Sequence, residues 1–454
     1  RWKKTAVSVK PSVKKEKKKG KRTTWMKAEK SDATPVVLLN DNKSRDAFMP
    51  VLDALIEKGT PFVIIPLTSQ NIDKDAYLQN NFADLIKTEN DEPEKKDRTL
   101  VLFSEGKNYW GTYKPVIEAL LAKGQPFTYY SMDIHDPALT IENDLMTSKY
   151  IGNGTMAFAK MSRVEADILL TTTPNIGTEN YPIKKSAKVR SLIHVWHSFG
   201  DYTYAWYHHG SLDNFDEVLT AGDYMDPQIR LIEQKRGLKE KKIVALGVPY
   251  LDELVKERAG INAKTDGKTI LIAPSWGTKS ILTVYGIDFV RDLAKAGFNV
   301  IVRPHPQSFK VEKDKIDGFK RDLSEYPNVV WDEQVNGNPS MAKSDLLISS
   351  DTSSVRMDFF ALYKRPVITL ELDVPDTSSY EYEDLKELLS HSTMATDIGD
   401  KISKADIGQI VNHVKAALSS ATDRDFDALT AKYAVNFSHA GEAVADYLIA
   451  ELNK

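Results

Sequence analysis

The chain of 454 residues contains no cysteine. This absence excludes disulfide bonds, thiolate catalysis and zinc sites built on cysteine, and it fits a reducing compartment. Other signatures are also missing: a GK[ST] phosphate loop, an HExxH zinc helix, a GxSxG nucleophile turn and a glycine-rich dinucleotide fingerprint. The sequence therefore disfavours P-loop kinases and NAD enzymes. No apolar run is long enough to span a bilayer.

The net charge of −3 conceals a strong asymmetry along the chain. Residues 1–30 hold 13 Lys or Arg against Glu16 and Glu29, a net of +11, so the remainder sums to −14. An acidic body excludes nucleic acid as its partner. The basic tail, residues 1–34, has no apolar periodicity and is predicted to be disordered.

Three interpretations of the tail remain open: a solvated linker, a nucleic-acid arm, or a strip that lies on an anionic membrane surface. We favour the membrane surface for residues 1–30. The chain begins at Arg1 rather than Met, and a basic segment beside a membrane anchor upstream of it would obey the positive-inside rule.

From residue 35 onward, short apolar runs alternate with amphipathic helices, which is typical of βαβ units on parallel sheets. The length favours two cores, and the polar stretch 256–268 is the expected junction. We expect an N-terminal Rossmann-like domain over 35–256 on the acceptor side and a C-terminal nucleotide-donor domain over 265–454. The predicted fold class is α/β, with two doubly wound domains that face a central cleft.

An internal repeat lies in the first predicted domain. "FMPVLDALIEKGTPF" (48–62) and "YKPVIEALLAKGQPF" (113–127) match without a gap, and each lies between two apolar strands. In both, proline is expected to open a helix and Lys-Gly to close it. We interpret 36–67 as a duplicated βα unit added to the N-terminal sheet. The segment between the copies, 87–98, is a charged, exposed connection.

Three predicted strands end in polar residues: "HVWHSFGD", "IVRPHPQ" and "LLISSDTSS". Carboxyl ends of parallel strands meet at one edge, where α/β folds bind ligands. In the first, His197 follows a buried strand and precedes Ser198, Gly200 and Asp201. Its function is either packing or proton transfer at the mouth of the cleft.

The second strand end places Arg303 and His305 two residues apart on one face. Arg303 offers a planar fork for phosphate, and His305 offers a second donor or a titratable group. An ordinary ion pair at a capped strand end explains this spacing equally simply, and from the dipeptide alone we favour it.

The third strand end carries six consecutive hydroxyl or carboxyl side chains and then enters an amphipathic helix. These residues are Ser349, Ser350, Asp351, Thr352, Ser353 and Ser354. Helix capping accounts for one or two of them. A helix that begins near Ser353 would direct free N–H groups at the cleft, which favours a phosphate site.

Two aromatic features have both a structural and a functional explanation. In "APSWGTKS" (273–280), Ser275 and Trp276 follow a strand, and Trp276 either stacks on a base or packs in a core. The stretch "DYTYAWYHHG" (201–210) lines an acceptor groove or packs between the domains. Its adjacent histidines, His208 and His209, point apart in an extended segment, which argues against a metal pair.

Taken in order, "WHSFGD", "GVPYLDEL", "LIAPSWG", "IVRPHP" and "SSDTSSVRMDF" resemble motifs of the CDP-glycerol glycerophosphotransferase family, which primes and polymerises teichoic acids of the cell envelope. The resemblance covers about residues 100–400. It implies a two-domain GT-B fold and a membrane-associated transferase at the cytoplasmic face of the bacterial cell membrane.

The resemblance also implies roles for individual residues. His197 matches the family's proposed catalytic base, and His305 matches the histidine that meets the donor diphosphate. Asp351, Ser353 and Ser354 match the phosphate-binding stretch. The family usually has glycine where this chain has Ser198, which puts the acceptor or the level of activity in doubt.

The implied reaction transfers a polyol phosphate, glycerol phosphate above all, from a CDP-linked donor to a hydroxyl of a lipid-linked or polymeric acceptor. No carboxylate cluster for Mg²⁺ is evident, so no cofactor is required, although a divalent metal is not excluded. Two alternatives stay open. One is a GT-B glycosyltransferase or epimerase that acts on a UDP-sugar, and the other is a membrane-tethered nucleotide-binding protein without turnover.

Overall fold

The computed structural model describes residues 99–454, apart from 180, 263–264, 335 and 374–376, together with the backbone of two short strands at 36–39 and 63–66. The chain divides into two compact units, Arg1–Glu92 and Pro93–Lys454. The basic tail, the expected helix of the first repeat copy and the connection at 87–98 lie outside the described residues.

The strands of the first repeat copy belong to the unit Arg1–Glu92, and the predicted place of this copy on the N-terminal sheet stays a prediction. Strand β1 (Val36–Leu39) pairs in parallel with β2 (Val63–Pro66), and the two form a sheet of their own. The N-terminal sheet ends on β5 (Met146–Tyr150), an edge strand that sequence analysis missed.

Seven parallel strands form the N-terminal sheet, in the order β5-β4-β3-β6-β7-β8-β9. Those not yet given are β3 (Leu100–Ser104), β4 (Phe127–Ser131), β6 (Ala166–Thr171), β7 (Val189–Val195), β8 (Glu217–Thr220) and β9 (Lys242–Ala245). The helices of this half are α3 (Trp110–Ala122), α4 (Gly154–Met161), α5 (Asp226–Arg236) and α6 (Tyr250–Ala259). Strand β7 is central and almost wholly buried, as its apolar run predicts.

Six parallel strands form the second sheet, in the order β12-β11-β10-β13-β14-β15. They are β10 (Thr269–Ile272), β11 (Asn299–Val302), β12 (Val329–Trp331), β13 (Leu346–Ser350), β14 (Val367–Leu370) and β15 (Gly399–Ile402). The helices between the strands are α7 (Ile281–Val284), α8 (Asp288–Lys295), α9 (Ser308–Val311), α10 (Lys313–Asp322), α11 (Asn338–Lys343), α12 (Val355–Tyr363), α13 (Tyr382–Ser390) and α14 (Met394–Asp397). The predicted pair of doubly wound α/β sheets is confirmed.

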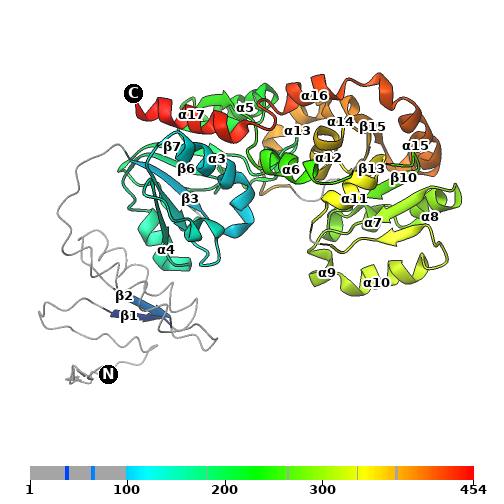
Figure 1. Ribbon diagram of the computed structural model, residues 1–454, viewed down its shortest axis with the longest axis horizontal. Helices are drawn as coiled ribbons and strands as arrows, with labels where there is room; N and C mark the ends of the chain where they lie inside the picture. The colour runs from blue at the N-terminus through cyan, green and yellow to red at the C-terminus, as the bar shows by residue number, and fades with distance from the viewer. Residues whose placement is uncertain are drawn as a thin grey trace, which may run out of the picture. The chain divides into compact units, whose positions relative to one another are not determined.

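The C-terminal stretch is helical, as predicted, with α15 (Ile410–Ser419), α16 (Phe426–Tyr433) and α17 (Ala440–Leu452). Its last helix, however, returns to the N-terminal half (Figure 1), where α17 lies beside α3. Val444, Leu448 and Leu452 of α17 share a buried cluster with strands β3, β4, β6 and β7. The second half therefore does not extend to the C-terminus, because the apolar face of α17 is buried on the first sheet.

Helix α3 begins earlier than the repeat suggests. It starts at Trp110, so Pro115 lies inside it rather than at its first position. The helix ends as predicted: Lys123 is the C-cap, and Gly124 follows at φ +72°, a conformation that glycine adopts without steric cost.

Close packing of α17 on α3 makes a testable prediction at Gly441. A Cβ atom there would lie 2.4 Å from Pro115 Cβ and 2.6 Å from its carbonyl carbon. Gly441→Ala should therefore lower the free energy of unfolding by about 1–3 kcal/mol through overpacking, although alanine favours helices. Gly408→Ala is the matched control, since nothing lies within 4 Å of its added Cβ. Equal urea midpoints for the two variants would contradict the tight contact.

Candidate functional site

His197 lies just beyond the carboxyl end of β7, where the backbone leaves the sheet. The preceding Trp196 is fully buried, whereas His197 is partly exposed. Its ring meets Tyr109 edge-on at 4.9 Å between centroids and stacks at 6.4 Å on Tyr207. Burial lowers the pKa of His197 to about 4, because a protonated imidazole loses hydration there. The ring is therefore neutral at pH 7.

Two pockets flank the His197–Ser198 peptide. The first, here called the His197 pocket, has a volume of about 240 Å³. Its lining comes from the start of α3, the end of β7 and helix α6: Asn108, Tyr109, Gly111, Thr112, His197, Tyr250, Glu253, Leu254 and Glu257. The Nδ1 atom of His197 is buried without a hydrogen-bond partner among the described residues, and the side chain is one of those that line this pocket.

The second pocket, here called the Ser353 pocket, has a volume of about 210 Å³ and joins the two halves of Pro93–Lys454. The β7 side contributes Ser198, Phe199, Gly200, Asp201, Tyr202, Thr203, Trp206 and Tyr207, and the β13–α12 side contributes Asp351, Thr352, Ser353, Ser354 and Arg356. Two of the three predicted strand ends therefore do meet. Ser198, Gly200 and Asp201 line this pocket together with residues of the hydroxyl cluster, and their predicted contact with a nucleotide or acceptor stays a prediction.

The hydroxyl cluster divides into a buried and an accessible part. Ser349 and Ser350 are fully buried, and Ser349 Oγ donates to the Ala273 carbonyl at 2.6 Å. Ser350 Oγ bonds Thr352 Oγ1 at 3.2 Å and does not line the Ser353 pocket. Ser349 therefore ties β13 to the segment after β10, whereas Ser350 contacts the loop that follows its own strand, and its predicted phosphate contact stays a prediction.

Thr352, Ser353 and Ser354 remain accessible at the start of α12, which begins at Val355, close to the predicted position. Asp351 lies directly before them and is 5% exposed. Burial raises its pKa to about 6, and its Oδ1 has no hydrogen-bond partner among the described residues. This carboxylate therefore suits a ligand that donates a hydrogen bond, such as a hydroxyl, better than a phosphate oxygen.

Arg356 is the main feature of the site that sequence analysis missed. It is 1% exposed, and its guanidinium forms a 3.3 Å ion pair with Asp201 across the Ser353 pocket. It also donates to the Ser353 carbonyl at 3.1 Å and to Thr369 Oγ1 at 3.2 Å. The available signal was an arginine in the apolar helix "VRMDFFALY", because a buried arginine requires partners.

Arg303 and His305 lie apart from both pockets. Arg303 forms a 2.7 Å ion pair with Asp332, which matches the simple alternative for this motif. His305 is exposed, and its Nδ1 accepts a hydrogen bond from the Gln307 N–H at 3.2 Å. Trp276 is 46% exposed and lies 6.5 Å from the His305 ring, while Ser275 is half-buried. A role of these four residues at the donor stays a prediction.

The aromatic stretch 201–210 packs between the two halves, which was one of the two interpretations drawn from the sequence. Tyr202 and Trp206 both stack on Tyr382 at the start of α13, at 6.4 and 5.6 Å. His208 stacks on Tyr380 at 5.1 Å. Tyr202 and Trp206 also line the Ser353 pocket, so this packing shapes one of its walls.

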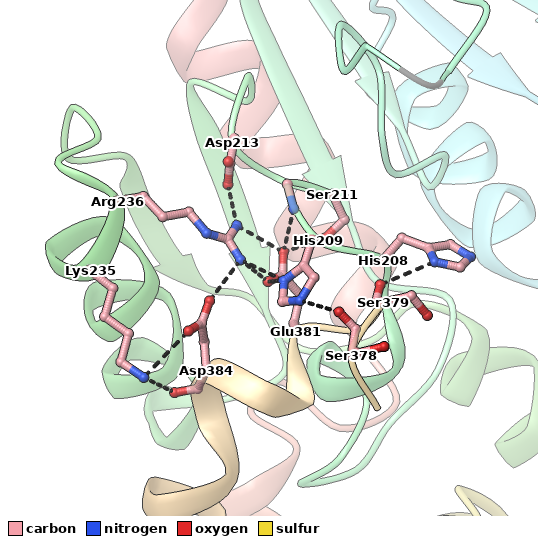
Figure 2. A network of polar contacts seen from close by, with 11 residues as sticks. His208, His209, Ser211, Asp213, Lys235, Arg236, Ser378, Ser379, Glu381 and Asp384 are labelled. Atoms are coloured by element: carbon pink, nitrogen blue, oxygen red, sulfur yellow. Dashed lines mark hydrogen bonds and ion pairs between the residues drawn. The ribbon is translucent and has the colours of Figure 1, made fainter. Parts of the chain in front are cut away.

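Beside this stretch, Arg236 anchors a partly exposed polar network, which Figure 2 shows. Its guanidinium contacts Glu381, which is fully buried, and lies 2.9 Å from Asp213 and 3.1 Å from Asp384. His209, Glu381 and Asp384 bring possible ligand atoms within 4.8 Å of one another. Arg236 pairs with both carboxylates and lies 3.2 Å from His209 Nδ1, and Lys235 also pairs with Asp384, so cationic side chains occupy this cluster and the network ties segment 378–384 to α5.

Comparison with known proteins confirms the predicted family resemblance. The family model for CDP-glycerol:poly(glycerophosphate) glycerophosphotransferases matches residues 205–391. The predicted enzyme class, a glycerophosphotransferase, is confirmed with it. No curated protein sequence matches the chain.

Solved structures show the fold. A UDP-GlcNAc 2-epimerase from Methanocaldococcus jannaschii matches at a TM-score of 0.50 and 13% identity, over 78% of this chain and 99% of that one. The wall teichoic acid polymerase TagF with CDPG matches at a TM-score of 0.49 and 16% identity, over 84% of this chain and 95% of that one. The predicted two-domain fold of GT-B type is confirmed. Among the described residues, no helix has the length and apolar character to cross a membrane.

His194, three residues before His197, is buried, and this burial predicts that the folded protein loses stability in acid. His194 is fully buried beside Trp196, and burial lowers its pKa to about 3. The unfolded chain binds a proton at this residue below about pH 6.5 and the folded chain does not, so stability falls as the pH drops from 7 to 5. His194→Phe should spare the protein roughly 2 kcal/mol of this loss.

Urea unfolding near pH 7 and pH 5 measures this difference between His194→Phe and the wild type. His413→Phe is the control, because His413 lies on α15 and is 35% exposed in its side chain. The same loss of stability in the wild type and in His194→Phe would contradict the assignment.

Proposed function

We propose that this chain, a glycerophosphotransferase by the family that its residues 205–391 match, transfers glycerol phosphate from CDP-glycerol to an acceptor hydroxyl and releases CMP. The observation that carries the proposal is the position of His197. Its neutral ring faces one pocket, and the next residue, Ser198, lines the other. An acceptor hydroxyl in the His197 pocket and a donor in the Ser353 pocket would meet at this peptide.

In the proposed reaction, Nε2 of His197 takes the proton of the acceptor hydroxyl as its oxygen attacks the phosphorus that bears glycerol. A new P–O bond forms, and the bond from that phosphorus to the bridging oxygen breaks. The electron pair of the broken bond stays with CMP. A hydroxyl is a weak nucleophile at neutral pH, so removal of its proton during attack is what the base contributes.

The Ser353 pocket offers fixed hydrogen-bond donors for the charge that develops. The hydroxyls of Ser353 and Ser354 lie at the amino end of α12, where N–H groups and the helix dipole favour anions. Arg356 neutralises Asp201 and holds the Ser353 carbonyl. The loop is thereby fixed before the substrate arrives, which avoids reorganisation during the reaction.

The acceptor in this proposal is a polymer or a lipid-linked chain at the cytoplasmic face of the membrane. The net charge of +11 on residues 1–30 supports the membrane part, since basic segments bind anionic lipid surfaces. The acidic remainder of the chain supports a partner other than nucleic acid.

A UDP-sugar is the alternative donor, because the fold likeness includes a UDP-GlcNAc 2-epimerase. The reaction would then occur at a sugar carbon rather than at phosphorus. A donor panel separates the two: CDP-glycerol should yield CMP in the presence of acceptor, whereas turnover of UDP-GlcNAc with no CMP from CDP-glycerol would favour the sugar reaction.

The central prediction concerns His197→Gln. With CDP-glycerol and a short glycerophosphate primer in membrane vesicles, CMP release should fall about 10²- to 10⁴-fold, as expected for loss of a general base. His413→Gln is the control on a distant helix and should retain the wild-type rate.

The pH profile provides an independent check on this base. A base must be neutral to act, and the pKa of His197 is about 4. Protonation of His197 should therefore leave the wild-type kcat/KM unchanged between about pH 7 and pH 5 and lower it only at more acidic pH. Full activity of His197→Gln would remove the proposed role.

A further inference from the structure

The charged residues that line the Ser353 pocket do not favour a diphosphate. Its ionisable lining residues of fixed sign at pH 7 are Asp201, Asp351 and Arg356. Two carboxylates and one guanidinium give this lining a net charge of −1. The guanidinium is 1% exposed and already pairs with Asp201, so it has no free face for a ligand. A diphosphate therefore needs a further cation at the pocket wall.

Lys279 is such a cation. It lies in the loop after β10, and its Nζ sits 3.4 Å above the ring centroid of Trp206, which lines the Ser353 pocket. The Nζ atom also lies 5.4 Å from the ring centroid of Tyr380, which belongs to the same half as Lys279, whereas Trp206 belongs to the other half. Lys279 thus ends the short turn Gly277–Lys279 after β10 and, although it does not itself line the Ser353 pocket, it contacts one of the aromatic residues that do.

The environment of Lys279 leaves its charge without a carboxylate. Within the described part of the chain, no acidic side chain lies within ion-pair distance of its Nζ, and its contacts are the two aromatic rings. Burial lowers the pKa of Lys279, because the half-buried ammonium has lost part of its hydration. A cation–π contact offsets only about 0.5–2 kcal/mol of this lost hydration. An anion that binds Lys279 therefore gains more electrostatic energy than it would from a fully hydrated lysine.

We propose that Lys279 binds the diphosphate of a nucleoside diphosphate donor at the Ser353 pocket, opposite the hydroxyls of Ser353 and Ser354. This inference rests on the proposed function and adds to it the cation that recognises the donor's phosphates. The ammonium leaves the face of Trp206 for the phosphate oxygens and brings the net charge of the wall from −1 to zero. Arg303, the cation that the sequence suggested, is paired with Asp332 instead.

Binding of CDP and of UDP to the full chain by calorimetry tests the proposal. Lys279→Met keeps the stem on Trp206 and removes the charge, and it should weaken both nucleotides about 10- to 100-fold, the loss expected for one charge-assisted hydrogen bond. Lys279→Arg keeps the charge and should stay within about threefold of the wild type. Lys295→Met is the matched control, since this exposed lysine ends α8 and lies near the amino edge of the sheet.

The outcomes separate this inference from the proposed function. Wild-type affinity in Lys279→Met, or equal losses in Lys279→Met and Lys295→Met, overturns the role of Lys279. Lys279-dependent CDP binding without CMP release from CDP-glycerol supports Lys279 and overturns the transfer reaction. Absence of CDP and UDP binding in the wild-type chain overturns both.

Discussion

The buried ion pair between Arg356 and Asp201 is the constraint on which the geometry of the site depends. Burial of two charges costs several kcal/mol for each ion unless partners satisfy them. Here the guanidinium meets Asp201, the Ser353 carbonyl and Thr369, and Ser392 Oγ donates to the second oxygen of Asp201 at 3.1 Å. A shift of either loop would leave a charge unpaired. The loop after β7 and the loop after β13 are therefore held in one arrangement.

Apolar packing between the same two segments also stabilises this arrangement. Phe199 lies 6.1 Å from Phe360 of α12 between ring centroids, and both belong to one buried cluster that extends across the two halves. On the far side of the 201–210 stretch, Arg236 ties α5 to Glu381. Packing excludes water from the Arg356–Asp201 pair, and both polar contacts in turn fix the orientation of the packed segments. The Ser353 pocket lies between these two anchors, and its walls are therefore set before a ligand binds.

Much of the fold could be predicted from sequence, because parallel strands in α/β domains are continuous apolar runs, as in the "SLIHV" of β7. The ends of these strands could therefore also be predicted, and with them the positions of His197, Asp201 and Ser353 beyond the strand ends. Edge strands are different: β5 alternates exposed and half-buried residues and carries little apolar signal. The return of α17 to α3 was also hidden, because an apolar helix face does not name its partner in the sequence; the close approach of Gly441 to Pro115 is seen only in the structure.

Partners of individual charges were harder to predict than strand ends, because an ion pair depends on residues far apart in sequence. Nothing near Arg303 in the chain reveals Asp332, and nothing near Arg356 reveals Asp201. Lys279 escaped notice for the opposite reason, since a lysine in a loop is ordinarily a solvated surface residue. Its ring contacts arise from Trp206, which belongs to the other half of Pro93–Lys454.

The low pKa of His197 acquires a functional meaning from the same electrostatics. A base with a pKa of about 4 is neutral at pH 7 but weak. A single negative charge about 6 Å away stabilises an imidazolium by about 3 kcal/mol at an effective dielectric constant of about 20, which raises the pKa by about two units. A bound diphosphate in the neighbouring pocket would thus strengthen the base only when the donor is present. Burial and substrate charge together would couple proton removal to donor occupancy, with no movement of the histidine.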